Sequence, residues 1–196
     1  MSVTALSQLP PPRARAVLRT WIDDSGFQLP DTARLDRILQ EMLTAREDRN
    51  PMVHWADVEL RRYRDRLYLM PALQLLNPAT ELEWDGEGVL ELPSGLGTLA
   101  LEPAATGISR KAWELGPVTV RFRAGGERCR PLGRDSSKGL KKLFQELGVP
   151  PWIRSRTPLV MIAAELAAVG DLWVCDRFQA EDADDALRVV WRDGPG

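Results

Sequence analysis

Residues 121–156 read RFRAGGERCRPLGRDSSKGLKKLFQELGVPPWIRSR. This stretch combines an amphipathic helical pattern with a concentration of positive charge. It contains ten Lys or Arg residues and three acidic residues, which gives a net charge of +7. Asp135 or Ser136 can cap the helix, and Gly148, followed by two prolines, ends it. The i, i+3, i+4, i+7 spacing of a buried helical face falls on Leu140, Leu143, Phe144 and Leu147.

A lysine-rich stripe lies opposite this apolar face on the predicted helix. The stripe is offset by two residues from the apolar positions, which corresponds to a rotation of about 200° around the helix axis. The stripe consists of Lys138, Lys141, Lys142 and Gln145. Three ammonium groups on one exposed face suit a polyanionic partner. The alternative is a solvated surface, which is the usual role of such a face.

The residues before the helix add further positive charge around flexible backbone. Gly125, Gly126 and Gly133 bracket four arginines, and glycine lets backbone N–H groups come close to a phosphate. These arginines are Arg123, Arg128, Arg130 and Arg134. With the lysine stripe and Arg154, they form the predicted nucleic-acid-binding surface.

A second basic cluster lies between residues 61 and 68, in a pattern typical of a strand. Arg62, Arg64 and Arg66 alternate and can share one face, while Tyr63 and Tyr68 are available to stack on an exposed base. We predict that Arg62 and Arg64 grip a nucleic-acid backbone. The alternative is an edge strand that its charges protect from aggregation.

Several segments of the chain carry a specific family resemblance. In the C-terminal half they are Val120–Arg123, Gly125–Pro131, Leu140–Glu146, Val149–Arg154, Glu165–Val169 and Leu172–Val174. In the N-terminal half they are Arg13–Trp21, Leu35–Leu43 and Arg61–Leu69. Together they resemble the C-terminal portion of bacterial tRNA(Ile)-lysidine synthetase, namely its substrate-binding domain and its C-terminal domain.

The resemblance implies a tRNA-recognition region with tRNA(Ile) as partner. The family enzyme is an ATP-dependent ligase that joins lysine to the wobble cytidine, and its catalytic domain carries a Ser-Gly-Gly-x-Asp-Ser loop. Here Gly125-Gly126 continues into Glu127-Arg128, so that motif is missing. The resemblance therefore assigns ATP, Mg²⁺ and lysine to the missing domain, and we expect no cofactor and no catalysis in this chain alone. The alternative function is a protein-interaction module whose basic helix face binds no RNA.

Composition sets the broad class of the protein. The 196 residues are 44% hydrophobic with a net charge of −2, so the basic segment is a local patch. Cys129 and Cys175 are far apart in the sequence and suggest no disulfide framework. No secretory leader and no apolar run long enough to span a membrane is present. We expect a reduced, cytoplasmic protein that binds neither membrane nor DNA.

The pattern along the chain predicts an α+β protein in three parts. Residues 1–72 form a helical domain with a small β-meander, in which Pro10-Pro11-Pro12 leads into one helix and Asp31 caps the next. Residues 73–117 form a turn-rich β connector, and residues 118–196 form a basic, mixed α/β domain. Strands are expected at 159–162 and 165–169, but Ala163-Ala164 lacks the usual hairpin chemistry between them.

Other reactive residue types give no site. His54 is the only histidine, so it cannot join a second one in a metal site. Cys129 lies between two arginines but has no histidine nearby in sequence to activate it. We therefore predict no catalytic residue and no metal ligand.

Overall fold

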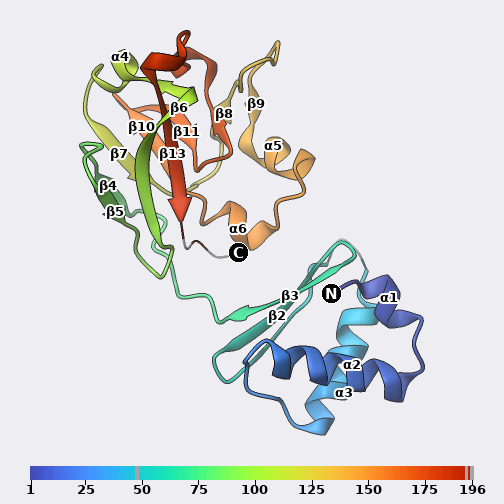
Figure 1. Ribbon diagram of the computed structural model, residues 1–196. Coiled ribbons are helices and arrows are strands. Elements are labelled where there is room, and N and C mark those ends of the chain that lie inside the picture. Colours follow the sequence, from blue (N-terminus) through green and yellow to red (C-terminus); the bar gives the residue numbers. More distant parts are fainter. Residues whose placement is uncertain (47–48, 193, 195–196) are drawn as a thin grey trace. The chain divides into compact units, whose positions relative to one another are not determined.

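The computed structural model describes residues 1–46, 49–192 and 194 of the chain. It divides into two compact units, Met1–Leu73 and Gln74–Gly196, and each is described by itself (Figure 1). Among the described residues, no helix is both long and apolar enough to cross a membrane.

Three helices and three strands build the first unit. The helices are α1 (Val3–Ser7), α2 (Pro11–Asp24) and α3 (Thr32–Thr44), and the strands are β1 (Met52–Trp55), β2 (Val58–Tyr63) and β3 (Arg66–Pro71). Asp31 caps α3 as predicted, because its carboxylate accepts a hydrogen bond from the Arg34 amide at 2.7 Å. The strands form an antiparallel meander in the order β1-β2-β3. The predicted helical domain with a β-meander is therefore confirmed.

The helical stripes and the meander share one apolar core. Leu18 and Ile22 of α2 and Ile38 of α3 are fully buried, together with Leu60 of β2. Val17, the residue before Leu18 on α2, is exposed. The first helix, α1, was not predicted from the sequence. It depends on Asp65, far along the chain, whose carboxylate accepts hydrogen bonds from the Thr4 amide at 2.7 Å and the Thr4 hydroxyl at 2.6 Å.

The second unit contains antiparallel sheets and short helices. Its strands before the basic helix are β4 (Glu81–Glu83), β5 (Val89–Glu91), β6 (Thr98–Ser109), β7 (Val118–Arg121), β8 (Arg128–Cys129) and β9 (Lys138–Gly139). The later strands are β10 (Leu159–Ile162), β11 (Glu165–Val169), β12 (Trp173–Val174) and β13 (Ala186–Arg192). The helices are α4 (Arg110–Trp113), α5 (Leu140–Glu146), α6 (Pro151–Arg154) and the 3₁₀ turns η1 (Asp176–Phe178) and η2 (Ala183–Asp185). Mixed helices and antiparallel sheets confirm the α+β class.

The strands of the second unit pair in two sheets and one short ribbon. The central sheet has the order β12-β11-β10-β7-β4, a second has the order β13-β6-β5, and β8 pairs only with β9. The core lies around the central sheet, where Val120, Phe122, Val160 and Phe144 are fully buried. Helix α5 contributes Phe144 to this core, so the apolar side of the basic helix anchors it to the sheet.

Residues 74–117 pack with the residues that follow them. Strand β4 pairs with β7, and the long strand β6 pairs with β13, which lies beside it in Figure 1. At Gly107 in β6, a Cβ atom would lie 2.2 Å from the Leu187 carbonyl oxygen, so only glycine allows this approach. The range set apart from sequence as a connector therefore supplies strands to the second unit.

The hairpin between β10 and β11 has the predicted strand boundaries and an unusual turn. Ile162 pairs with Glu165, and Ala163 and Ala164 form the two-residue connection with φ values of 48° and 65°. Positive φ at both positions is what a type I′ turn requires, and Asn-Gly or Gly-Gly usually supplies it. The strand twist and the buried neighbours, rather than local turn chemistry, fix the register here.

Candidate nucleic-acid interface

The basic helix is shorter than its sequence pattern predicts. Helix α5 begins at Leu140 with Gly139 as its N-cap, and no side chain caps it. The predicted caps, Asp135 and Ser136, lie in an exposed turn before β9, because residues 138–139 pair with β8 instead of continuing the helix. Leu147, predicted to be buried, is 56% exposed because the helix has ended before it.

The lysine stripe therefore divides into two parts. Lys141 and Lys142 lie on α5 and are exposed, and within the described part of the chain no ion pair at 4.0 Å or less engages either ammonium group. Lys138 lies on β9, and its Nζ donates to a Glu146 carboxylate oxygen at 2.9 Å. The same carboxylate pairs with Arg134 at 3.2 Å. Two of the predicted phosphate ligands thus already share an internal counterion.

Glu146 responds electrostatically to these cations. The hydrogen bond from Lys138 lowers the pKa of the Glu146 carboxyl below its usual value, and the positive charges of Lys138, Arg134 and Lys142 lower it further. The carboxylate therefore stays ionised and competes with an incoming phosphate for Lys138 and Arg134. Sequence reasoning gave Glu146 no role, although its place four residues after Lys142 is a recognisable ion-pair spacing.

The glycine turn also carries an internal acceptor. Gly125 and Gly126 have φ values of 109° and 88°, so the turn needs glycine. The Glu127 carboxylate accepts hydrogen bonds from the Ala124 amide at 2.8 Å and the Gly125 amide at 3.0 Å. Burial alone would raise the pKa of Glu127, but these amides and Arg123 lower it. The amides predicted to receive a phosphate are therefore occupied by Glu127, which also pairs with Arg123 at 3.6 Å.

Strands β8 and β9 and the turn between them, residues 128–139, form what we call the basic ribbon; it lies close to α5 in Figure 1. Arg128 donates to the Ser137 carbonyl oxygen at 2.6 Å and thereby closes the turn. Arg130 pairs with Asp176. Residues 132–137 of the ribbon are all exposed. The ribbon therefore presents its cations at the surface, each held by a neighbour from the same unit.

Two of the predicted contact residues are buried and serve the fold. Arg62 is 8% exposed, and its guanidinium donates to the carbonyl oxygens of Met42 at 2.5 Å and Ala45 at 3.1 Å, where it caps the end of α3. Arg154 is also 8% exposed and donates to the Val149 carbonyl oxygen at 2.7 Å. The alternating sequence pattern at Arg62, Arg64 and Arg66 does not show that backbone carbonyl groups from the end of α3 lie beside one face of the strand.

The other arginines of the first unit differ in exposure. Arg64 is exposed in the turn after β2, with its guanidinium 5.2 Å from the centre of the Tyr63 ring. Tyr63 itself is buried and so does not offer a free face for stacking. Arg61 pairs with the buried Glu59 at 2.7 Å. Arg64 thus keeps its predicted exposure, whereas Arg62 does not.

The two cysteines lie together, which overturns the expectation that they form no disulfide. Cys129 of β8 and Cys175 are joined as a disulfide, with their Cα atoms 5.4 Å apart. A bridge between Pro131 and Cys175 and a hydrogen bond from the Asp176 amide to the Arg130 carbonyl oxygen, at 2.8 Å, align the two segments. Separation along the chain gave no indication of this pairing, which tertiary structure alone creates.

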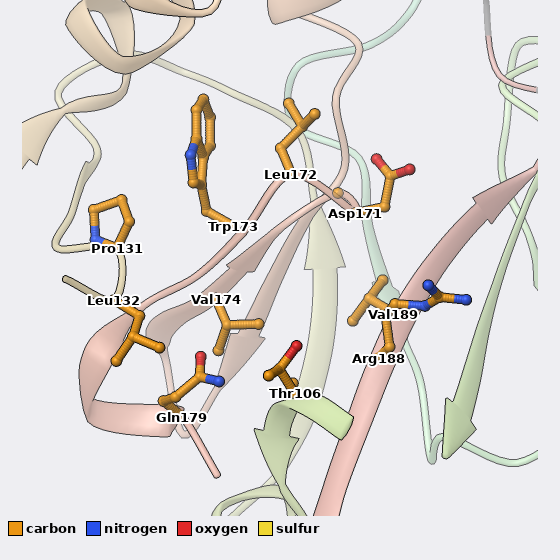
Figure 2. Close-up of a pocket in the computed structure, with 12 residues that line it drawn as sticks. Thr106, Pro131, Leu132, Asp171, Leu172, Trp173, Val174, Gln179, Arg188 and Val189 are labelled. Atoms are coloured by element: carbon orange, nitrogen blue, oxygen red, sulfur yellow. The ribbon is translucent and has the colours of Figure 1, made fainter. Parts of the chain in front are cut away.

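A shallow pocket lies beside the ribbon (Figure 2). Its volume is about 290 Å³, and its lining combines the apolar side chains of Leu132, Trp173 and Val174 with the polar ones of Thr106 and Gln179. Among the described residues that line it, none is a Ser, Cys, His or Lys. Within the described residues, no group of three His, Cys, Asp or Glu side chains is placed to hold a metal ion, and His54 is exposed.

Comparisons with known proteins match both units. The TilS substrate binding domain matches residues 1–68, and the TilS substrate C-terminal domain matches residues 118–191. The tRNA(Ile)-lysidine synthase of Coxiella burnetii is 40% identical over 181 residues, covering 92% of this chain and 40% of that protein. The tRNA(Ile)-lysidine synthase of Methylococcus capsulatus is 41% identical over 189 residues, covering 95% of this chain and 43% of that protein.

A crystal structure of a TilS C-terminal domain aligns with 58% of this chain and 97% of its own length, at 23% identity and a TM-score of 0.47. The chain spans about two fifths of the length of the curated relatives that it matches.

Proposed function

Because the chain belongs to the tRNA(Ile)-lysidine synthase family, through a substrate binding domain and a C-terminal domain matched in that order, we propose that it is the tRNA-recognition region of such an enzyme. The observation that carries the proposal is this double match on a chain whose second unit presents exposed cations along α5 and the basic ribbon. Cationic side chains bind the phosphate backbone and fix the position of an RNA, while duplex shape and contacts to base edges add selectivity.

We propose different roles for the predicted contact residues according to their exposure and partners. Lys141 and Lys142 are exposed without a partner carboxylate in the described chain, so we assign them the first phosphate contacts. A second group contacts RNA only after exchanging an internal partner for a phosphate, and it consists of Arg123, Arg128, Arg130, Arg134 and Lys138. Arg64 of the first unit adds a further exposed cation, whereas Arg62 and Arg154 hold the fold.

We propose that the whole protein is a ligase that uses ATP to join lysine to the wobble cytidine of tRNA(Ile). The described residues of this chain do not suit binding of ATP or Mg²⁺. The Glu127 carboxylate accepts hydrogen bonds from the amides of the turn at Gly125-Gly126, and no cluster of metal-ligating side chains lies among the described residues. We assign ATP, Mg²⁺ and lysine to the part of the relatives outside the match. This chain alone is expected to bind tRNA without modifying it.

Direct binding tests the proposal. Fluorescently labelled tRNA(Ile) transcript is titrated with the purified chain at low salt, and unlabelled tRNA, duplex DNA and an acidic protein serve as competitors. Saturable binding that tRNA displaces more effectively than DNA supports the proposal. No binding to tRNA, together with capture of the acidic protein, would support a protein-interaction module instead.

A further inference from the structure

The backbone pairing that holds the basic ribbon is short. Strands β8 and β9 share two residue pairs, Arg128 with Gly139 and Cys129 with Lys138. On the other side, the ribbon is joined to the segment before η1 by the Cys129–Cys175 bond and by the hydrogen bond from the Asp176 amide to the Arg130 carbonyl oxygen. The disulfide is therefore the only covalent tie in the described chain between the ribbon and the rest of the unit, apart from the backbone itself.

A small molecule can approach this bond from the surface. A pocket of about 270 Å³ is lined by both cysteines and by Arg128, Arg130 and Arg177. The carboxylates of Asp176 and Glu165 pair with two of these arginines, so the lining keeps one excess positive charge. Such a lining favours a small thiol that carries carboxylates over a neutral or cationic one.

We propose that the Cys129–Cys175 bond is a redox modification site, which a glutathione-type thiol opens and the corresponding disulfide closes. The bond, when formed, keeps the basic ribbon ordered, and this order raises its affinity for RNA. The part concerning RNA rests on the proposed function. Cys175 is 7% exposed and Cys129 2%, so the incoming thiolate attacks the Cys175 sulfur. A mixed disulfide forms on Cys175, and Cys129 leaves as a thiolate that takes a proton from water. A second thiolate attacks the glutathione sulfur, releases Cys175 and leaves oxidised glutathione, so two electrons pass from two thiols to the bond.

Opening the bond changes the packing at a crowded place. Two sulfur atoms that are no longer bonded need an ordinary contact separation of about 3.5 to 4 Å. Both cysteines are buried except toward the pocket that they line, so the sulfur atoms separate as the two segments move apart into that space. The Arg130–Asp176 contacts, one residue from each cysteine, are the first to loosen. A loosened ribbon must be ordered again when RNA binds, which lowers the affinity.

The test compares the oxidised chain, the chain reduced with glutathione, and a Cys129→Ser/Cys175→Ser variant. Thiol alkylation and mass spectrometry report the state of the bond, hydrogen exchange of residues 124–139 reports the order of the ribbon, and titration of labelled tRNA reports affinity. We expect reduction to occur without global unfolding and to raise exchange in the ribbon. It should also weaken tRNA binding by about three- to tenfold, reversibly on addition of oxidised glutathione. The double serine variant should behave like the reduced chain in either buffer.

Each outcome separates this proposal from the general function. A bond that oxidised glutathione cannot form in the folded chain, or ribbon exchange that is the same in both states, would refute the redox site. Equal tRNA affinity in both states would refute its control of binding. If no state binds tRNA, the proposed function fails, while bond formation and ribbon exchange still report on the redox site.

Discussion

Replacing Ala163-Ala164 by Asn-Gly should stabilise the second unit. Both alanines are held at positive φ, at 48° and 65°, where the Cβ atom crowds the following carbonyl oxygen. This conformation costs an L-residue roughly 1 to 2 kcal/mol, whereas glycine adopts it freely and asparagine adopts it more readily than alanine. Glycine returns part of this gain, because its unfolded chain has roughly 0.5 to 1 kcal/mol more conformational entropy to lose.

The net gain expected for Ala163→Asn/Ala164→Gly is about 1 to 2 kcal/mol in the free energy of unfolding. For a unit of this size, such a gain raises Tm by roughly 4 to 8 °C. Both side chains are exposed, so the substitutions remove no packing. Urea denaturation followed by circular dichroism measures the gain, and an unchanged m-value shows that the surface exposed on unfolding is the same.

The matched control is Ala168→Gly in the neighbouring strand β11. Ala168 is fully buried and pairs with Val160, so glycine there gives no relief of strain and should cost about 1 kcal/mol. Opposite signs for the turn and strand substitutions are therefore expected. If the double substitution left the stability unchanged, or if Ala164→Gly alone lowered it, the alanine turn would not be strained, and the reasoning from φ would be wrong.

Three further predictions concern the charged groups. Glu146→Gln should free Lys138 and Arg134 and strengthen tRNA binding several-fold. The plot of log affinity against log salt should steepen by up to roughly 1.4 to 1.8. Weaker binding would instead mean that the carboxylate positions these cations. The folded-state pKa of Glu146 is lowered, so its ion pairs contribute stability above the ordinary carboxyl pKa of about 4.3, and this stability is lost as pH falls through the lower folded value. In acid denaturation the parent should therefore lose more stability than Glu146→Gln over that pH range. Parallel curves of stability against pH would contradict this. Arg62→Ala should leave the Met42 and Ala45 carbonyl groups without their donor and cost about 1 to 3 kcal/mol of stability in the first unit. Calorimetry measures this loss. A flatter dependence of tRNA affinity on salt in the folded variant would show that Arg62 contacts RNA.

The sequence predicted those parts of the fold that local chemistry determines. The Asp31 cap, the small β-meander of the first unit and the β10–β11 boundaries depend on capping, alternation and apolar runs, and the structure has all of them. The connector predicted at 73–117 instead contributes the long strand β6, in which Gly107 accommodates the Leu187 carbonyl oxygen of its neighbour. That interaction joins residues far apart in the chain, so no local pattern reports it.

The sequence predicted where positive charge gathers, but not which side chains meet there. Charge counting located the basic segment, and the exposed Lys141 and Lys142 agree with it. It missed that Glu127 and Glu146 neutralise nearby groups, because a count of charges ignores which side chains meet. It also missed the Cys129–Cys175 bond, since the pairing arises from strand placement. A residue type predicts what a side chain can bind, whereas burial decides whether it is available.

The central claim, that the second unit binds RNA through α5, is tested most directly by a salt titration of tRNA affinity for Lys141→Ala/Lys142→Ala. The control is Arg110→Ala/Lys111→Ala, which removes two exposed charges from α4 in the same unit. Alanine is the best helix former, so the first variant should keep its fold. If both amines contact phosphates, the plot of log affinity against log salt should flatten by roughly 1.4 to 1.8, whereas the control should match the parent. An unchanged slope and affinity in the folded lysine variant would contradict the assignment of RNA binding to this helix.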